Sequence, residues 1–169
     1  MAAEIFVLAV FPLLLAVAAG WDVASFTIPN TISVALLTAF TGFALAVQMP
    51  FGDVGGHLLA GLIGFVVGFT LFAFGLIGGG DAKLFACTAL WLGLPDLPAY
   101  ALFASVAGGA LTVFLLLLRR FPLPPIFMRE VWLVRLHDAK SGIPYGVALA
   151  LGALLVLPQT EIFRLALAR

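Results

Sequence analysis

The chain has 169 residues, of which 64% are hydrophobic and 9% are charged, and its eight Lys and Arg side chains balance its eight Asp and Glu side chains. Soluble domains carry charge on about a quarter of their residues, and disordered or nucleic-acid-binding proteins also need more charge than this sequence has. The mean hydropathy of +1.24 therefore predicts an all-α, polytopic membrane protein in contact with the lipid bilayer and with no nucleic-acid partner.

Apolar runs of about 20 residues predict membrane-spanning helices. Six such runs are present: 5–21, 31–49, 57–77, 81–94, 98–118 and 142–157. The first run has no basic residue before it, so we interpret it as a retained helix rather than a secretory signal. The fourth run covers only about 20 Å of a hydrocarbon layer about 30 Å thick, so it starts within the preceding glycines or is partly re-entrant. With no repeat and no long linker, residues 1–169 are expected to form a single membrane-embedded domain.

Basic residues in short loops mark the cytoplasmic face of a membrane protein. Lys83 follows the third run, and five basic residues lie between the fifth and sixth runs: Arg119, Arg120, Arg129, Arg135 and Lys140. With six spans, these residues share one face, which is predicted to be cytoplasmic. Both chain ends then lie outside, with Arg164 and Arg169 as exceptions to the rule. Residues 126–138 show no helical or strand period, and we interpret them as an interfacial segment.

Six of the eight acidic residues have an ordinary solvated interpretation, because they lie in turns, in the basic loop or near the chain ends: Glu4, Asp53, Asp96, Glu130, Asp138 and Glu161. Two acids remain. Asp22 lies at the inner end of the first helix, and it is the only charge in residues 20–30. Asp81 follows three glycines at the inner start of the fourth helix. Because two helices separate them, both aspartates are predicted on one face of the membrane at similar depth.

A structural role is open for these polar residues. Asp81 could cap the fourth helix, and Asn30, which follows Pro29, could cap the second. The glycines before Asp81 favour another role, because glycine lets a second backbone, such as an extended substrate strand, come close. Two neighbouring carboxylates share a proton, so one could accept a proton from water while the other donates to a carbonyl oxygen, as in aspartic proteases.

Nucleophilic and metal-dependent alternatives have little support in the sequence. Cys87, His57 and His137 fall in three different predicted environments, where packing or surface roles are the simpler interpretation. A single cysteine excludes an intramolecular disulfide framework and a cysteine zinc site, and we expect neither a metal nor a cofactor.

Together these residues resemble the type IV prepilin peptidases, membrane aspartic peptidases of the Gly-x-Gly-Asp class. The resemblance lies in Asp22 followed by Ile28-Pro29-Asn30, in the stretch from Gly78 to Leu84, and in Ile143-Pro144-Tyr145-Gly146 at the start of the last helix. Six helices in 169 residues resemble the small single-domain form found with tight-adherence (Flp-type) pilus systems.

The resemblance implies that Asp22 and Asp81 are the catalytic pair of an endopeptidase. Such an enzyme cleaves the leader of prepilin or pseudopilin substrates after a glycine, at the cytoplasmic face of the bacterial inner membrane. It also implies no cofactor, an association with pilus assembly machinery, and substrate or backbone positioning by Gly78, Gly79, Gly80, Lys83, Ile28, Pro29, Asn30, Pro144, Tyr145 and Gly146.

Three details refine these expectations. Lys83 lies two residues from Asp81 and points elsewhere on a helix, so it either stabilises local charge or faces lipid headgroups. Larger relatives carry a cytoplasmic methyltransferase region with zinc-binding cysteine pairs; this sequence shows neither, so we expect cleavage without N-methylation. Residues 23–27 lack the basic side chains that family members often carry there, which leaves leader recognition open.

Two other functions stay open at this point. A small ion-coupled transporter could use both aspartates as proton or cation sites at broken helices. A catalytically inactive scaffold of a pilus machine could also retain the motifs. Transport sites usually lie near the membrane midplane, whereas both aspartates are predicted near one face.

Overall fold

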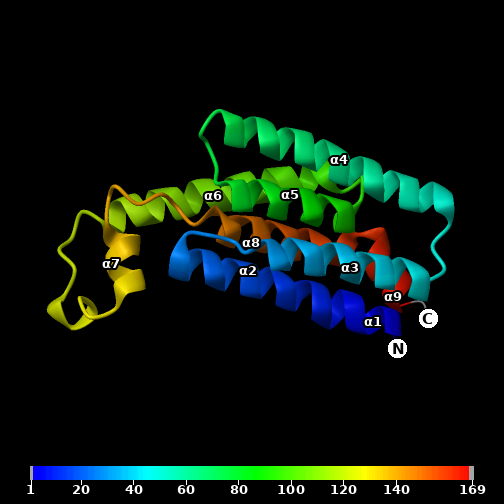
Figure 1. Ribbon diagram of the computed structural model, residues 1–169, viewed down its shortest axis with the longest axis horizontal. Coiled ribbons are helices and arrows are strands. Elements are labelled where there is room, and N and C mark those ends of the chain that lie inside the picture. The colour runs from blue at the N-terminus through cyan, green and yellow to red at the C-terminus, as the bar shows by residue number, and fades with distance from the viewer. Residues whose placement is uncertain (1, 168–169) are drawn as a thin grey trace.

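The computed structural model describes residues 2–167, which form an elongated helical bundle without strands (Figure 1). Its α-helices are α1 (Ala2–Ile5), α2 (Phe11–Ser25), α3 (Asn30–Ala46), α4 (Phe51–Ala73), α5 (Gly79–Leu92), α6 (Leu97–Leu118), α7 (Val131–His137), α8 (Tyr145–Val156) and α9 (Glu161–Leu167). A π-helical turn, η1 (Phe6–Val10), joins α1 to α2, and two 3₁₀ turns, η2 (Pro125–Phe127) and η3 (Leu157–Gln159), precede α7 and α9. This confirms an all-α fold.

Each of the six predicted runs is helical. The fourth begins at Gly79, inside the glycine run, which is one of the two alternatives expected for it. By length and apolarity, three segments of the described chain are able to cross a membrane: Phe6–Ser25, Phe51–Ala73 and Leu97–Leu118. A fourth is added if α8 with η3 and α9, which meet at a bend of 56°, count as one span. The protein is therefore an all-α membrane protein, and six spans stay a prediction.

Proline and left-handed residues set the helix boundaries. Phe26 ends α2 with a φ of 56°, and Pro29 then fixes extended backbone before α3. Gly93 ends α5 with a φ of 84°, a conformation that only glycine adopts without strain. The proline cluster at 122–125 keeps α6 from continuing beyond Arg119, as the sequence predicts.

Helix α5 lies in the centre of the bundle, and every residue from Leu84 to Leu92 is buried. Trp91 anchors it: its ring stacks on Phe11 at 4.6 Å between centroids, and its Nε1–H donates to the Leu36 carbonyl at 2.9 Å. Figure 1 shows α5 in the middle of the bundle, with α4 on one side of it and α8 on the other. Because protein rather than lipid surrounds it, this helix need not match the thickness of the bilayer.

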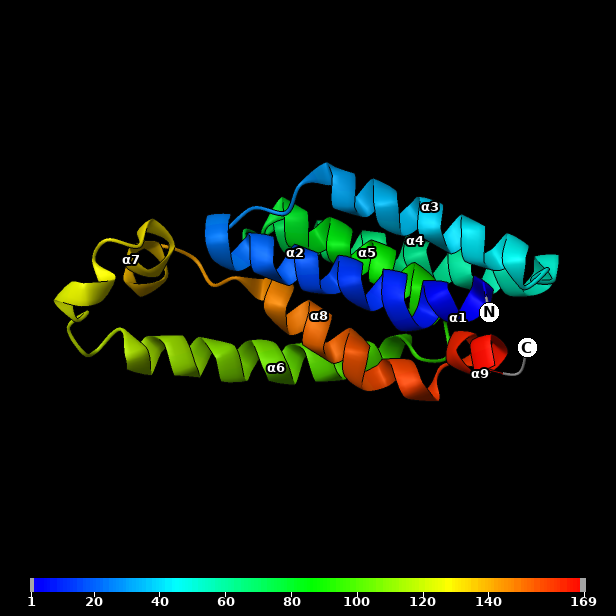
Figure 2. The same ribbon diagram turned by 90° about the horizontal axis from the view of Figure 1, so that it is seen from below.

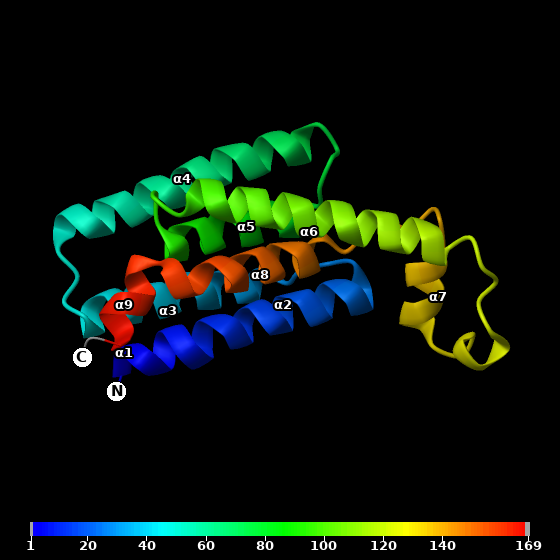
Figure 3. The ribbon, with the colours of Figure 1, turned by 180° about the vertical axis from the view of Figure 1, so that it is seen from behind.

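Small residues bring two helix pairs into close contact. A methyl group at Gly64 of α4 would lie 2.7 Å from the Ala89 Cβ of α5, and one at Gly152 of α8 would lie 2.7 Å from the Ala104 backbone nitrogen of α6. Figure 2 shows α6 and α8 running side by side, and Figure 3 shows α8 between α2 and α6. Such small-residue interfaces let helices associate by packing where lipid removes the hydrophobic driving force.

Two short helices have no counterpart among the predicted elements. Helix α7 lies within residues 126–138, for which no regular structure is predicted, and α9 lies beyond the last predicted run. The Arg119 guanidinium holds the loop around α7 by donating to the carbonyls of Leu136 at 3.0 Å and Gly142 at 2.9 Å. The loop therefore folds back on the end of α6 (Figure 2). Arg169, predicted to be external, lies outside the described residues.

Candidate active site

Asp22 occupies the last turn of α2 and is buried, with 4% of its surface exposed. The left-handed Phe26 closes that turn by donating its backbone N–H to the Asp22 carbonyl at 2.7 Å. The chain reverses immediately afterwards through Pro29 into α3. The end of α2 therefore holds the Asp22 carboxylate at the end of the bundle where α7 lies (Figure 1).

Asp81 is the third residue of α5, at the same end of the bundle. Gly78 is the N-cap residue of α5, and its backbone N–H donates a hydrogen bond to Asp81 Oδ2 at 3.1 Å. The Asp81 side chain therefore reaches back to the start of its own helix. Its Oδ1 is also buried but has no hydrogen-bond partner within the described part of the chain. A buried carboxylate oxygen without a partner is unusual, because its desolvation is uncompensated. One oxygen of Asp81 is thus structural and the other is free.

Gly146, at the start of α8, joins the two aspartates. Its backbone N–H donates to Asp22 Oδ2 at 2.7 Å and also interacts with the Asp81 carboxylate. The Asp22 charge in turn acts electrostatically on Asp81. A methyl group at Gly146 would lie 2.9 Å from Asp22 Oδ2, so only glycine lets the α8 backbone come this close. Three segments distant in sequence thereby converge on the aspartate pair, Asp22 and Asp81.

Ile28 fills the space between these segments. A methyl group at Gly80 would lie 3.1 Å from the Ile28 backbone nitrogen, and one at Gly146 would lie 3.0 Å from its Cδ1. The close approach that the glycine run predicts is therefore present at Gly80. In this structure it is Ile28 of the chain itself, rather than a substrate strand, that makes it.

The other residues named by the resemblance surround this centre. Lys83 is exposed, and its Nζ donates to Asn30 Oδ1 at 2.8 Å, which ties the start of α3 to α5. The alternative left open for Asn30, capping of α3, is not seen, because Pro29 occupies the cap position and the Asn30 side chain accepts from Lys83. Pro144 occupies the cap position of α8.

Two further residues of the resemblance pack on neighbouring helices. The Tyr145 ring lies 3.0 Å from a methyl group placed on Gly108 of α6, so it contacts that helix. A methyl group placed on Gly79 would lie 3.4 Å from the Phe72 ring of α4, an ordinary contact distance. Both residues therefore support helix packing, and neither has a hydrogen bond to the aspartate pair.

One contribution at this end is not predicted by the sequence. Arg135 of α7 donates to the Ser25 carbonyl at 3.3 Å, which connects the basic loop to the last turn of α2. Residues 126–138 give no pattern that would reveal this contact. The residue pattern also does not predict that the Gly146 N–H is a hydrogen-bond donor to an aspartate. Gly146 was named only because of the family resemblance.

The residues considered for other chemistry lie elsewhere. Cys87 is buried in α5 beside the Ser33 carbonyl, and His57 lies near the start of α4. Across residues 2–167, no group of three or more His, Cys, Asp or Glu side chains could hold a metal ion. What the geometry offers is a pair of buried carboxylates, each with one oxygen held by a backbone N–H, and this arrangement is suited to proton transfer.

Comparison with known proteins identifies one family. A sequence model described as the type IV leader peptidase family matches residues 9–113, a range that contains both Asp22 and Asp81. No curated protein and no solved structure gives a significant match to the chain.

Proposed function

The chain belongs to the type IV leader peptidase family, and we propose that it is a membrane aspartic endopeptidase that uses Asp22 and Asp81 to cleave the leader of prepilin-like proteins. The observation that carries the assignment is the convergence of two buried carboxylates on the backbone N–H of Gly146. A pair of acids fixed in this way has the composition of an aspartic protease centre.

The chemistry follows from the oxygens that remain available. Gly146 and Gly78 each occupy one carboxylate oxygen, so Asp22 Oδ1 and Asp81 Oδ1 are left for water and substrate. The pair holds one proton. The ionised carboxylate takes a proton from water as the water oxygen attacks the scissile carbonyl carbon, and the protonated partner donates to the carbonyl oxygen. When the tetrahedral intermediate collapses, the C–N bond breaks and the leaving amine takes the proton that the first carboxylate accepted from water. The proton on the re-forming carbonyl oxygen returns to the other carboxylate, so the pair again holds one proton. The two acids act as one titrating unit.

The distribution of charge supports a cytoplasmic location for this centre. Lys83 and the basic loop lie at the end of the bundle that holds the aspartate pair, and basic loops favour the cytoplasmic side. We therefore propose that in a bacterium the centre faces the cytoplasm from the inner membrane, where a leader is accessible before its protein is assembled. The family suggests prepilin-type substrates, and we propose prepilins or pseudopilins together with an association with the pilus assembly machinery.

The test is leader processing in cells that co-express a candidate prepilin. Asp22→Asn and Asp81→Asn keep side-chain shape but remove proton exchange, so each should slow processing by about 10²–10⁴-fold. Glu130→Gln is the matched control, because it makes the same chemical change at the same end in a side chain with no capping hydrogen bond. The size shift of the prepilin on a gel measures the outcome.

Two results would contradict the proposal. Processing at the wild-type rate in either aspartate variant would remove that residue from the chemistry, and a defect of similar size in Glu130→Gln would show that the assay reports general damage. An ion-coupled transporter would leave the prepilin unprocessed with the wild-type chain as well.

A further inference from the structure

An apolar groove of about 470 Å³ lies on the side of the bundle between α3 and α4. Both helices pack on α5 but have little contact with each other, so α5 forms the floor of the groove and α3 and α4 form its walls. Figure 1 shows α3 and α4 apart along most of their length and joined where the chain passes from one to the other. Neither the family assignment nor the proposed chemistry uses this space.

The residues that line the groove recur at one spacing in all three helices. The floor consists of Lys83, Ala86, Cys87 and Leu90 of α5. The same pattern of i, i+3, i+4 and i+7 runs from residue 30 to residue 37 in α3 and from residue 58 to residue 65 in α4. Residues at this spacing share one face of a helix over two turns, so the groove is about 10 Å long and follows the helix axes.

The groove is polar at one end and apolar along the rest of its length. Asn30 and Lys83 begin the rows of α3 and α5, at the end of the bundle that holds the aspartate pair, and Ser33 follows one turn later. The other residues that line it are apolar. Those of α4 include Leu58 and Leu62, each more than half exposed on a segment able to cross a membrane. The apolar part of the groove is therefore open to lipid.

Lys83 gives the polar end a positive charge without a matching acid. It is the single charged residue among those described that line the groove. Its Nζ donates to Asn30 Oδ1 at 2.8 Å, and it forms no ion pair within residues 2–167. An ammonium group has three N–H donors, so two stay available at the mouth of the groove. A cation above an apolar slot is complementary to an anionic amphiphile.

The volume of the groove favours an alkyl chain over a helix as its occupant. An α-helix with its side chains is about 10–12 Å wide, so a segment about 10 Å long occupies roughly 800–1,100 Å³. The groove encloses about 470 Å³, which is about half of that volume. An alkyl chain is narrower than a helix and flexible, so it can lie between the two walls along the whole groove.

We propose that this groove, which we call the lipid groove, is a binding site for an anionic phospholipid of the surrounding membrane. The phosphate contacts the Lys83 ammonium group, and an acyl chain lies along the apolar walls. The bound lipid fills the gap between α3 and α4 and connects these two helices beside Asp81. The site requires only that the chain is embedded in a membrane, so it does not depend on the proposed peptidase activity.

Photo-cross-linking of the full-length chain in lipid nanodiscs tests the proposal. The probes are phosphatidylglycerol and phosphatidylcholine, each with a diazirine in the middle of one acyl chain, so the charge of the headgroup differs and the chain is the same. We expect the anionic probe to label peptides from 30–37, 58–65 and 83–90 about fivefold more strongly, the preference that one lysine near an anionic lipid confers. Unlabelled phosphatidylglycerol should compete with the probe, and inorganic phosphate should not.

Variants locate the headgroup and the chain. Lys83→Gln should remove the preference for the anionic probe and Lys83→Arg should keep it, whereas Lys140→Gln, the same change at an exposed lysine outside the groove, should behave like the wild type. Val34→Trp places a large ring in the groove and should reduce labelling by both probes. Leu45→Trp is its control, because Leu45 is exposed on the same helix outside the groove.

Four results would each overturn the proposal. These are equal labelling by the two probes, an unchanged preference in Lys83→Gln, competition by inorganic phosphate, and displacement of the label by an uncharged leucine–alanine peptide of about 20 residues, which spans a membrane as a helix. The last result would assign the groove to a helix instead of a lipid. Melting temperatures show that each variant is folded. Prepilin processing is assayed separately, so failure here does not bear on the aspartate pair.

Discussion

Replacing Gly146 with Ala tests whether the α8 backbone, and not only the two acids, builds the proposed catalytic centre. The added methyl group would meet Asp22 Oδ2 at 2.9 Å, Ile28 Cδ1 at 3.0 Å and Asp22 Cβ at 3.1 Å. None of these atoms is the free end of a long flexible side chain, so the start of α8 must move away. The 2.7 Å hydrogen bond from Gly146 to Asp22 then lengthens or breaks.

The size of the effect follows from these contacts. Overpacking a tight site costs about 1–3 kcal/mol, and a hydrogen bond to a charged group contributes about 1.5–3 kcal/mol. A displacement of about 1 Å in a catalytic centre lowers activity by about 10²-fold. We therefore expect Gly146→Ala to fold with reduced thermal stability and to process a prepilin about 100-fold more slowly than the wild type.

The assay is the rate of leader cleavage per folded molecule, with purified enzyme at graded concentrations and the melting temperature measured in parallel. Gly20→Ala is the matched control, because Gly20 lies two residues before Asp22 and a methyl group there meets nothing within 4 Å. Cleavage by Gly146→Ala at the wild-type rate would refute the role of the α8 backbone. An equal loss in Gly20→Ala would refute the steric reasoning.

The remaining predictions concern helix packing and pH. Gly152→Ala places a methyl group 2.7 Å from the Ala104 backbone nitrogen, so it should lower the free energy of unfolding by about 1–3 kcal/mol. The molecules that fold should still cleave normally. The matched variant Gly109→Ala, whose methyl group meets nothing within 4 Å, should melt no lower than the wild type. Burial raises the pKa of the Asp96 carboxyl, and Arg164 and His57 partly oppose this. Because the folded protein then holds this proton more tightly than the unfolded chain, thermal stability should fall as the pH rises through the range just above that of an ordinary aspartate, and Asp96→Asn should flatten this part of the profile of melting temperature against pH. A melting temperature that rises with pH across this range and does so equally in Asp96→Asn would contradict the burial of this carboxyl.

Much of the fold could be predicted because lipid imposes a simple rule. Apolar runs of the right length are helices, and the glycines and prolines between them end those helices, so the six runs agree with the structure to within a few residues at most boundaries. The short helices α7 and α9 escape this rule. Each has only seven residues, and α7 depends on hydrogen bonds from Arg119 and Arg135 to distant carbonyls rather than on an apolar period.

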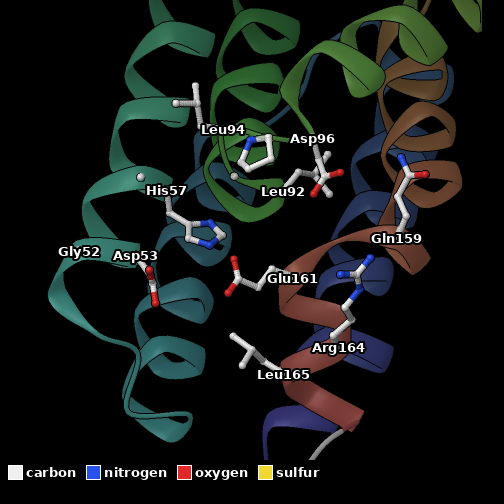
Figure 4. Close-up of a pocket in the computed structure, with 13 residues that line it drawn as sticks. Gly52, Asp53, His57, Leu92, Leu94, Asp96, Gln159, Glu161, Arg164 and Leu165 are labelled. Carbon is white, nitrogen blue, oxygen red and sulfur yellow. The ribbon is translucent and has the colours of Figure 1, made fainter.

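The candidate site was predictable in part for a similar reason. Charge is so scarce that Asp22 and Asp81 stand out, and counting helices places them at one end, where the structure brings them together through Gly146. The possible capping role of Asn30 is not realised, because its side chain accepts a hydrogen bond from Lys83, which is 53 residues away in sequence. The cavity at the opposite end of the bundle, lined by Asp53, Asp96 and Glu161 (Figure 4), could not be predicted, since each of these acids lies in an ordinary turn or near the chain end, and only the packing of α4, the turn before α6 and α9 places them around one cavity.

The small-residue contacts between helices have one more consequence. The most extensive contacts in the bundle are those of α4 with α5 and of α6 with α8, and α2 packs next most extensively on α8. Asp81 therefore belongs to the α4–α5 pair, while Asp22 belongs to α2, which packs on α8. The proposed catalytic pair thus lies where these two groups of helices meet. We expect a molecule that separates the two groups to slow cleavage by moving the acids apart, without contacting either one.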